Sequence, residues 1–145
     1  MKITLLIFNF YLLIMFPLNV FANLCKIPTT LTGKRIVLEL NGQYTTNNPR
    51  AGELQEFTFI SSTTLKERSF HTGQGLSGPY QYQVLAPDIG LLTTTLMQKE
   101  ILISKFDLIF MCQNNTTGRY IFSQGEGIEK PTIRQNVGTY FIRSH

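Results

Sequence analysis

Five segments between residues 78 and 142 alternate apolar and polar side chains, and each ends in a polar or glycine-containing turn. In chain order they read GPYQYQVL, IGLLTTTLM, FDLIFMCQ, TGRYIFS and VGTYFI. Alternation at a period of two is the pattern of a β-strand with one buried face. The chain after residue 22 shows no amphipathic helix of comparable quality. The sequence therefore predicts an all-β domain.

The preceding part of the chain supplies further strand candidates, which read KRIVLEL, ELQEFTFIS and TLKERSFH. The turn dipeptide Asn41-Gly42 favours a hairpin with a short second strand over residues 43–46. TLKERSFH is the most polar candidate, so we expect an edge or rim strand there, with a short helical turn as the alternative. The total is seven or eight strands. A sequential antiparallel meander of this length protects its edges best by closing into a barrel.

Two glycine-containing stretches are expected to be connections between strands. Residues 73–78 form a literal G-x-G-x-x-G. A dinucleotide site needs that motif between a strand and a helix, whereas here Pro79 and a strand follow, so we expect a loop without nucleotide. The polar stretch over residues 124–136 is expected to be a second long loop.

The N-terminal residues have the three parts of a secretory signal peptide. Lys2 is a short positive region, residues 3–16 are largely apolar, and Val20 and Ala22 stand at the −3 and −1 positions of a cleavage site. The apolar run is shorter than the roughly 20 residues that a membrane anchor needs. We predict a signal peptide over residues 1–22, a single domain over residues 23–145, and a secreted or periplasmic protein without a stable membrane anchor after cleavage.

Cys25 and Cys112 are the two cysteines of the chain. Export would bring them to a compartment in which disulfides persist. An even pair has one possible connectivity, so a Cys25–Cys112 disulfide is predicted.

The formal net charge of +4 is spread along the chain. Nucleic-acid-binding domains instead cluster lysine and arginine along one face. We expect no nucleic-acid partner.

No catalytic or metal-binding constellation is evident. His71 is the one internal histidine, whereas a catalytic zinc takes about three protein ligands, so neither metal nor another cofactor is expected. The acids at positions 39, 56, 88, 100 and 107 alternate with apolar residues or lie in turns, as on solvated strand faces. Catalysis by paired carboxylates needs two convergent acids in one apolar setting. We therefore predict that the protein is not an enzyme.

Several strand patterns resemble the small bacterial calycin domains, which are lipocalin-like and include the MoaF type. The resemblance covers residues 33–142 and rests on Gly33-Lys34 opening a strand, GPYQYQVL, IGLLTTTL, the FDLIFMCQNNTTGRYIF hairpin and the closing VGTYFI. The opening G-x-W of true lipocalins would fall at residues 33–35, where tryptophan is absent. The resemblance implies a lipocalin-like barrel that binds an apolar or small ligand, and it transfers no catalytic residue.

The aromatic residues of the strands belong first to the core, and some are expected to line a ligand cavity. Buried phenols must satisfy their hydroxyl groups and can offer them to a ligand. The predicted ligand-binding residues are Tyr80, Tyr82, Tyr120 and Phe110.

Two functions remain open on this evidence. The first is an exported barrel that binds a small apolar ligand without catalysis. The second is a protein-interaction or inhibitor domain with a filled barrel, contacting its partner through residues 73–78 and 124–136. A cavity would favour the first, whereas a packed interior with an exposed apolar loop patch would favour the second. Convergent acids inside the barrel would revive an enzyme.

Overall fold

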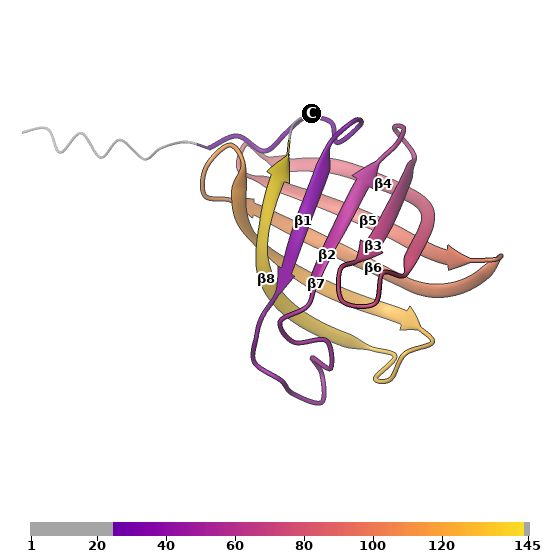
Figure 1. Ribbon diagram of the computed structural model, residues 1–145. Helices are drawn as coiled ribbons and strands as arrows, with labels where there is room; N and C mark the ends of the chain where they lie inside the picture. Colours follow the sequence, from indigo (N-terminus) through magenta and orange to yellow (C-terminus); the bar gives the residue numbers. More distant parts are fainter. Residues whose placement is uncertain (1–24, 144–145) are drawn as a thin grey trace, which may run out of the picture.

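The computed structural model describes residues 25–143, which form eight antiparallel strands and no helix. Each strand pairs with its neighbours in the sequence, and β8 pairs with β1, so the sheet closes into a barrel (Figure 1). The predicted all-β meander and its closure are confirmed. In chain order the strands are β1 (Arg35–Leu40), β2 (Leu54–Phe59), β3 (Thr64–Ser69), β4 (Gly75–Ala86), β5 (Ile89–Gln98), β6 (Ile101–Cys112), β7 (Thr117–Gly127) and β8 (Arg134–Arg143).

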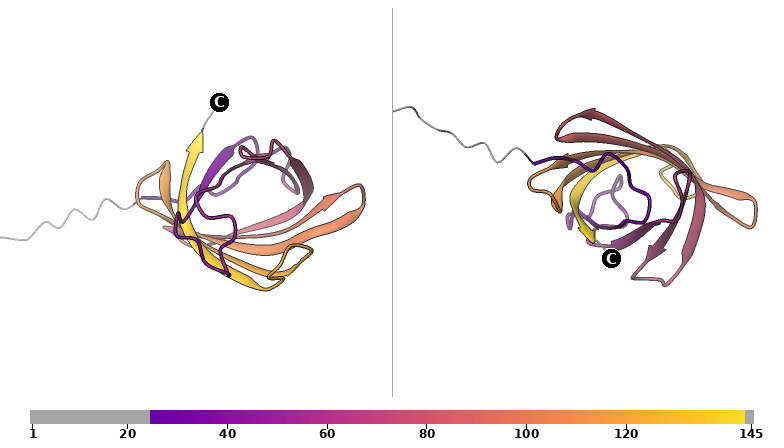
Figure 2. Two further views of the ribbon diagram at one scale, coloured as in Figure 1. Left: turned by 60° about the horizontal axis from the view of Figure 1, so that its bottom comes forward. Right: turned by 90° about the horizontal axis from the view of Figure 1, so that it is seen from above.

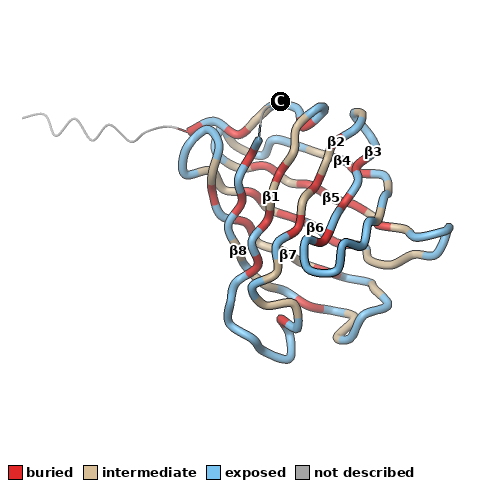
Figure 3. Tube along the Cα trace, viewed as in Figure 1, coloured by how far each residue is buried: buried red, intermediate tan, exposed pale blue. Residues whose placement is uncertain are grey.

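Strand alternation places one set of side chains inside the barrel and the other set outside. Along β5, Leu92, Thr94 and Leu96 are buried, while the residues between them are half-buried. Buried residues also alternate with more exposed ones along β1, β2 and β3 (Figure 3). Because side chains on a strand point to opposite faces in turn, the period of two in the sequence becomes the inside and outside of the barrel.

Reciprocal glycine–tyrosine pairs shape the contact between β7 and β8. Tyr120 is paired with Gly138, and Gly118 is paired with Tyr140. A Cβ atom on Gly138 would lie 2.6 Å from the Tyr120 ring and 2.2 Å from the carbonyl oxygen of Glu39. Glycine therefore leaves the space in which each tyrosine ring lies across the neighbouring strand.

One end of the barrel, called the closed end, is covered by the segment over residues 25–34, at the top of Figure 1 and across the barrel in the right view of Figure 2. Ile27 and Leu31 of this segment are buried in the core. The Ile27 amide donates to the carbonyl of Pro87 at 2.9 Å, and the Tyr82 hydroxyl donates to the carbonyl of Pro28 at 2.8 Å. Apolar contacts and backbone hydrogen bonds thus hold the segment in place.

The predicted disulfide is confirmed. Cys25, in the segment over the closed end, is bonded to Cys112 at the end of β6, with Cα atoms 6.0 Å apart. The bond closes a loop of 87 residues. Disulfides are typical of proteins in oxidising compartments.

The opposite end, called the open end, carries the loops over residues 41–53, 70–74 and 128–133. The expected strand over residues 43–46 is wrong, since only an isolated bridge between Thr45 and Asn48 forms there. The reason is the Asn48 side chain, whose amide donates to the carbonyls of Asn41 at 2.9 Å and Gln43 at 3.0 Å. These bonds fold the segment into a loop at the end of β1.

TLKERSFH forms the predicted strand, β3, but the expectation of an edge strand is wrong, and so is the alternative of a helical turn. β3 pairs with β2 on one side and β4 on the other, because a closed barrel has no edge. Leu65, Glu67 and Ser69 are buried, whereas Lys66 and Arg68 face outward. A charged residue therefore lies on the inner face of this strand.

Two predicted loops are shorter than expected. β4 begins at Gly75, inside the expected connection over residues 73–78, and its Gly78 lies against the backbone of Thr95 on β5. β7 continues to Gly127 and β8 begins at Arg134, which leaves residues 128–133 as the connection. Polar side chains in these stretches face outward or toward other polar groups. The polar composition therefore suggested loops where the backbone forms strands.

The predicted signal peptide and its cleavage site lie outside the described residues. Within residues 25–143, no helix is long and apolar enough to cross a membrane.

Candidate functional site

A cavity of about 280 Å³ lies inside the barrel toward the open end. Part of its lining is apolar and consists of Leu38, Leu96, Phe106 and Phe122, together with the ring of Tyr120. Buried polar groups form another part, which is called the polar wall. Those that line the cavity are Asn48, Gln55, Glu67, Ser69, Gln124 and Arg134. The cavity lining therefore combines apolar and polar groups, as the linings of small-molecule sites do.

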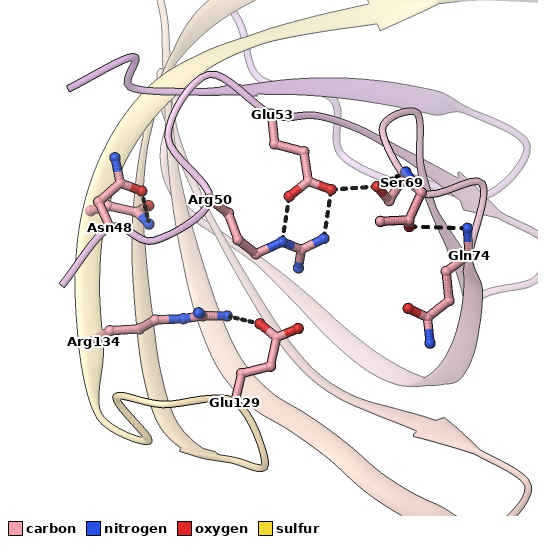
Figure 4. A network of polar contacts seen from close by, with 9 residues as sticks. Asn48, Arg50, Glu53, Ser69, Gln74, Glu129 and Arg134 are labelled. Carbon is pink, nitrogen blue, oxygen red and sulfur yellow. Dashed lines mark hydrogen bonds and ion pairs between the residues drawn. The ribbon is translucent and has the colours of Figure 1, made fainter. Parts of the chain in front are cut away.

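The loop over residues 41–53 places an ion pair at the cavity. The Arg50 guanidinium donates to both carboxylate oxygens of Glu53, with Nη2 at 2.7 Å from Oε1, and the Ser69 hydroxyl also donates to Glu53 (Figure 4). The Gln55 side-chain oxygen accepts from Arg50 Nη2 at 3.0 Å. Burial opposes ionisation of Glu53, but the hydrogen bonds from Arg50 and Ser69 outweigh it and lower its pKa.

Arg134, at the start of β8, supplies a second cation. Its side chain is 6% exposed, and its guanidinium lies 5.7 Å from the centre of the Phe122 ring. Nη2 donates to Glu129 Oε2 at 3.2 Å (Figure 4). The Glu129 side chain is itself 51% exposed. Nε and Nη1 of Arg134 are buried and have no hydrogen-bond partner among the described residues. Buried guanidinium N–H groups usually bind an acceptor, so this arginine retains capacity for one.

Glu67 supplies a buried carboxyl group from β3. The residue is 5% exposed and lines the cavity, and within residues 25–143 it forms neither an ion pair nor a side-chain hydrogen bond. Burial raises its pKa to about 7. The charges of Glu53 and Glu129 act in the same direction, whereas those of Arg50 and Arg134 act against it. Glu67 thus changes charge near neutral pH.

Uncharged hydrogen bonds fix the remaining polar wall. Gln124 accepts from the Ser104 hydroxyl at 2.7 Å and donates to the carbonyl of Thr132 at 2.9 Å. Asn136 donates to the Asn48 side-chain oxygen at 3.3 Å, while its own side-chain oxygen is buried without a partner. These bonds tie β7 to β6 and to the loop over residues 128–133, and they tie β8 to the loop over residues 41–53.

Of the four predicted ligand-binding residues, only Tyr120 lines this cavity. Its hydroxyl donates to the carbonyl of Glu39 at 3.4 Å, and burial raises its pKa. The Tyr80 hydroxyl donates to the carbonyl of Ser61 at 2.8 Å, and Tyr82 binds the segment over the closed end. Phe110 packs edge-on against Tyr140 with ring centres 5.1 Å apart. Tyr80 and Phe110 thus lie in the core and Tyr82 packs against it, and ligand binding by any of the four stays a prediction.

Sequence reasoning missed the charged residues of the site, namely Arg50, Glu67 and Arg134. The signal for two of them was present. Glu67 stands two residues from Leu65 in a strand, and Arg134 stands at the same alternation as Tyr140 and Ile142 in β8. If the alternation of inward-facing and outward-facing residues had been continued through the polar stretches, both side chains would have been predicted inside the barrel.

Within residues 25–143, no group of three or more histidine, cysteine or acidic side chains gathers in an arrangement that could hold a metal ion. His71 is exposed in the loop over residues 70–74. The polar wall instead offers hydrogen-bond donors and acceptors, which suit an organic ligand.

No protein-family model, curated protein or solved structure matches the chain. The closed barrel of eight antiparallel strands is compatible with the calycin architecture that the sequence resembles. The MoaF type within that architecture stays a prediction.

Proposed function

We propose that the protein binds one small molecule inside the barrel and releases it unchanged. The observation that carries this proposal is the cavity of about 280 Å³ with its apolar and polar lining groups. Its size is close to the lower limit of the roughly 300–1,000 Å³ typical of small-molecule sites. The calycin resemblance, with its expected small or apolar ligand, supports the same function.

The place of action that we propose is outside the cytoplasm, either secreted or periplasmic. The Cys25–Cys112 disulfide and the predicted signal peptide support it. In that setting a binding protein of this kind would carry or sequester its ligand.

The proposal includes the absence of catalysis, although Glu67 has the raised pKa that catalytic acids often show. The nearby carboxylates are already engaged, since Glu53 binds Arg50 and Ser69, and Glu129 binds Arg134. A pair of acids free to act on one substrate is therefore not assembled by these contacts. Recovery of the bound molecule with unchanged mass after prolonged incubation tests this point.

Filling the cavity tests the binding function. Ile103 lines the cavity, whereas Ile109 lies on the outer face of the same strand, β6. We expect Ile103→Trp to abolish binding of the neutral fluorescent probe N-phenyl-1-naphthylamine and Ile109→Trp to leave it unchanged. Equal binding by both variants would place the probe elsewhere and overturn the proposal.

A second candidate function, interaction with a protein partner, is favoured by one observation. Ile133 is 72% exposed in the loop over residues 128–133, within the stretch proposed for partner contact. Crosslinking in an exporting host would compare Ile133→Ser with Leu85→Ser, a change at an exposed residue of β4. A crosslinked partner lost only in Ile133→Ser would favour this function, and identical patterns in both variants would count against it.

A further inference from the structure

Some charged groups of the cavity have all their hydrogen-bond partners, and others do not. What they imply about the ligand rests on the proposed binding function. Arg50 and Glu53 neutralise each other through two hydrogen bonds, and Ser69 and Gln55 complete the pair. That pair needs nothing more from a ligand.

Arg134 and Glu67 remain with unused capacity on the same cavity. Arg134 has two buried N–H groups without acceptors, and its one ion-pair partner is a half-exposed carboxylate. Glu67 is buried without any donor among the described residues. They form no ion pair with each other, although both line the cavity. Buried N–H groups without acceptors and a buried carboxylate without a donor are costly, so each group favours a ligand that brings the opposite charge.

From this arrangement we infer that the ligand is an amphiphilic zwitterion, with a carboxylate or similar anion that binds Arg134 and an ammonium group that binds Glu67. The apolar part of the ligand lies against Leu96, Phe106 and Phe122, which line the same cavity. An α-amino acid with an unbranched alkyl side chain is the simplest molecule of this class. A fork of guanidinium N–H groups suits a carboxylate, and a carboxylate suits an ammonium group.

A series of ligands with eight carbon atoms tests the inference by calorimetry at pH 8. We expect 2-aminooctanoate to bind at least tenfold more tightly than octanoate, octylamine or 1-octanol. The isomer 8-aminooctanoate has the same composition but carries its charges at opposite ends, so it should bind at least tenfold more weakly than 2-aminooctanoate.

Two substitutions assign the two charges. Glu67→Gln should reduce the advantage of 2-aminooctanoate over octanoate about tenfold, and Arg134→Gln should reduce its advantage over octylamine by a similar factor. Arg119→Gln and Glu126→Gln change exposed residues of β7 and should leave both ratios unchanged. Thermal unfolding of each variant verifies that the barrel is intact.

The outcomes separate this inference from the function on which it rests. Binding of 1-octanol and octanoate as tight as that of 2-aminooctanoate would overturn the zwitterion and leave the ligand-binding function standing. Absence of binding by every member of the series and by N-phenyl-1-naphthylamine would overturn the proposed function itself.

Acidification gives an independent reading of the Glu67 contact. Because burial raises the pKa of Glu67 to about 7, protonation removes the charge that attracts the ammonium group. The charged groups acting on Glu67 are Arg50, Glu53, Glu129 and Arg134. Binding of 2-aminooctanoate should weaken at least fivefold from pH 8 to pH 5.5 in the wild type and stay constant in Glu67→Gln. Equal losses in both proteins would overturn the assignment of Glu67.

Discussion

The two ends of the barrel differ in what their inward-facing residues do. Near the closed end these residues are apolar or aromatic, as with Phe59, Leu65 and Phe110. The hydroxyls of buried Tyr80 and half-buried Tyr82 donate to backbone carbonyls. Near the open end they are largely polar. Of the seven buried polar or charged residues of the described chain, only Thr94 does not line the cavity.

This contrast indicates that stability and binding are supplied by different parts of the same barrel. Burial of apolar surface stabilises a fold, whereas buried charges with incomplete partners cost stability and suit a ligand site. The closed end should therefore control the free energy of unfolding, and the open end should control affinity. Each prediction below tests one side of that division.

The largest effect is expected in the closed half of the core. Phe59 is fully buried and meets the Tyr80 ring edge-on with ring centres 5.0 Å apart. Phe59→Ala should lower the free energy of unfolding by about 4 kcal/mol, because it leaves a cavity in packed surroundings. Denaturation in guanidinium chloride measures this loss. Phe70→Ala, at a residue that is 49% exposed, should change stability by less than about 0.5 kcal/mol.

The disulfide should stabilise the fold without contributing to the cavity at the other end. Cys25→Ser/Cys112→Ser should lower the free energy of unfolding by about 3 kcal/mol, because the unfolded chain is no longer constrained by its 87-residue loop. Urea denaturation of the variant and of the reduced wild type should agree. The variant should still bind N-phenyl-1-naphthylamine with wild-type affinity under native conditions, and a tenfold loss would contradict the separation of the two ends.

The closed end was also the half that the sequence predicted better. Segments such as FDLIFMC contain apolar residues at every second position, so inward-facing residues and strand type follow from one pattern. The disulfide was predicted because the chain has two cysteines, which allow one pairing, and because export was expected. Local patterns suffice where the inner face of the barrel is uniformly apolar.

The open end was missed because its inner face is polar. In TLKERS, Glu67 has the alternation of a buried residue but the chemistry of a solvated one, and composition was given more weight than period. The tyrosines were assigned to a ligand because their hydroxyls need acceptors. Carbonyl groups from distant segments, such as Pro28 for Tyr82, already supply those acceptors. Contacts across more than fifty positions of sequence are not encoded in a local pattern.

The buried carboxyl group of Glu67 tests how much the polar interior of the open end lowers the free energy of unfolding. Its pKa is raised from an ordinary value of 4.5 to about 7, so its ionisation opposes folding. Below pH 4.5 the carboxyl is protonated in both states and costs nothing. Between pH 4.5 and pH 7 the carboxyl ionises in the unfolded chain but stays largely protonated in the folded one, so the wild type should lose about 2 to 3 kcal/mol relative to Glu67→Gln. Denaturation at pH 4.5 and pH 8 measures the difference, and a constant gap between the two proteins would contradict a buried, unpartnered carboxylate.

The smallest effect concerns the hairpin turn between β5 and β6, on the side of the open end. Lys99 and Glu100 have φ angles of 47° and 69°, in the left-handed region that favours glycine. Glu100 is exposed, so Glu100→Gly should raise the free energy of unfolding by about 1 kcal/mol through relief of backbone strain.

Asp88→Gly is the matched change in the exposed turn between β4 and β5, where φ is not positive. It should lower stability by up to about 1 kcal/mol, because glycine adds freedom to the unfolded chain. Thermal unfolding of both variants measures these opposite shifts.

Neither variant should alter probe binding, since neither residue lines the cavity. A loss of affinity in Glu100→Gly would mean that the turn between β5 and β6 helps to shape the cavity, and the division between the two ends would then have to be drawn within the open end itself.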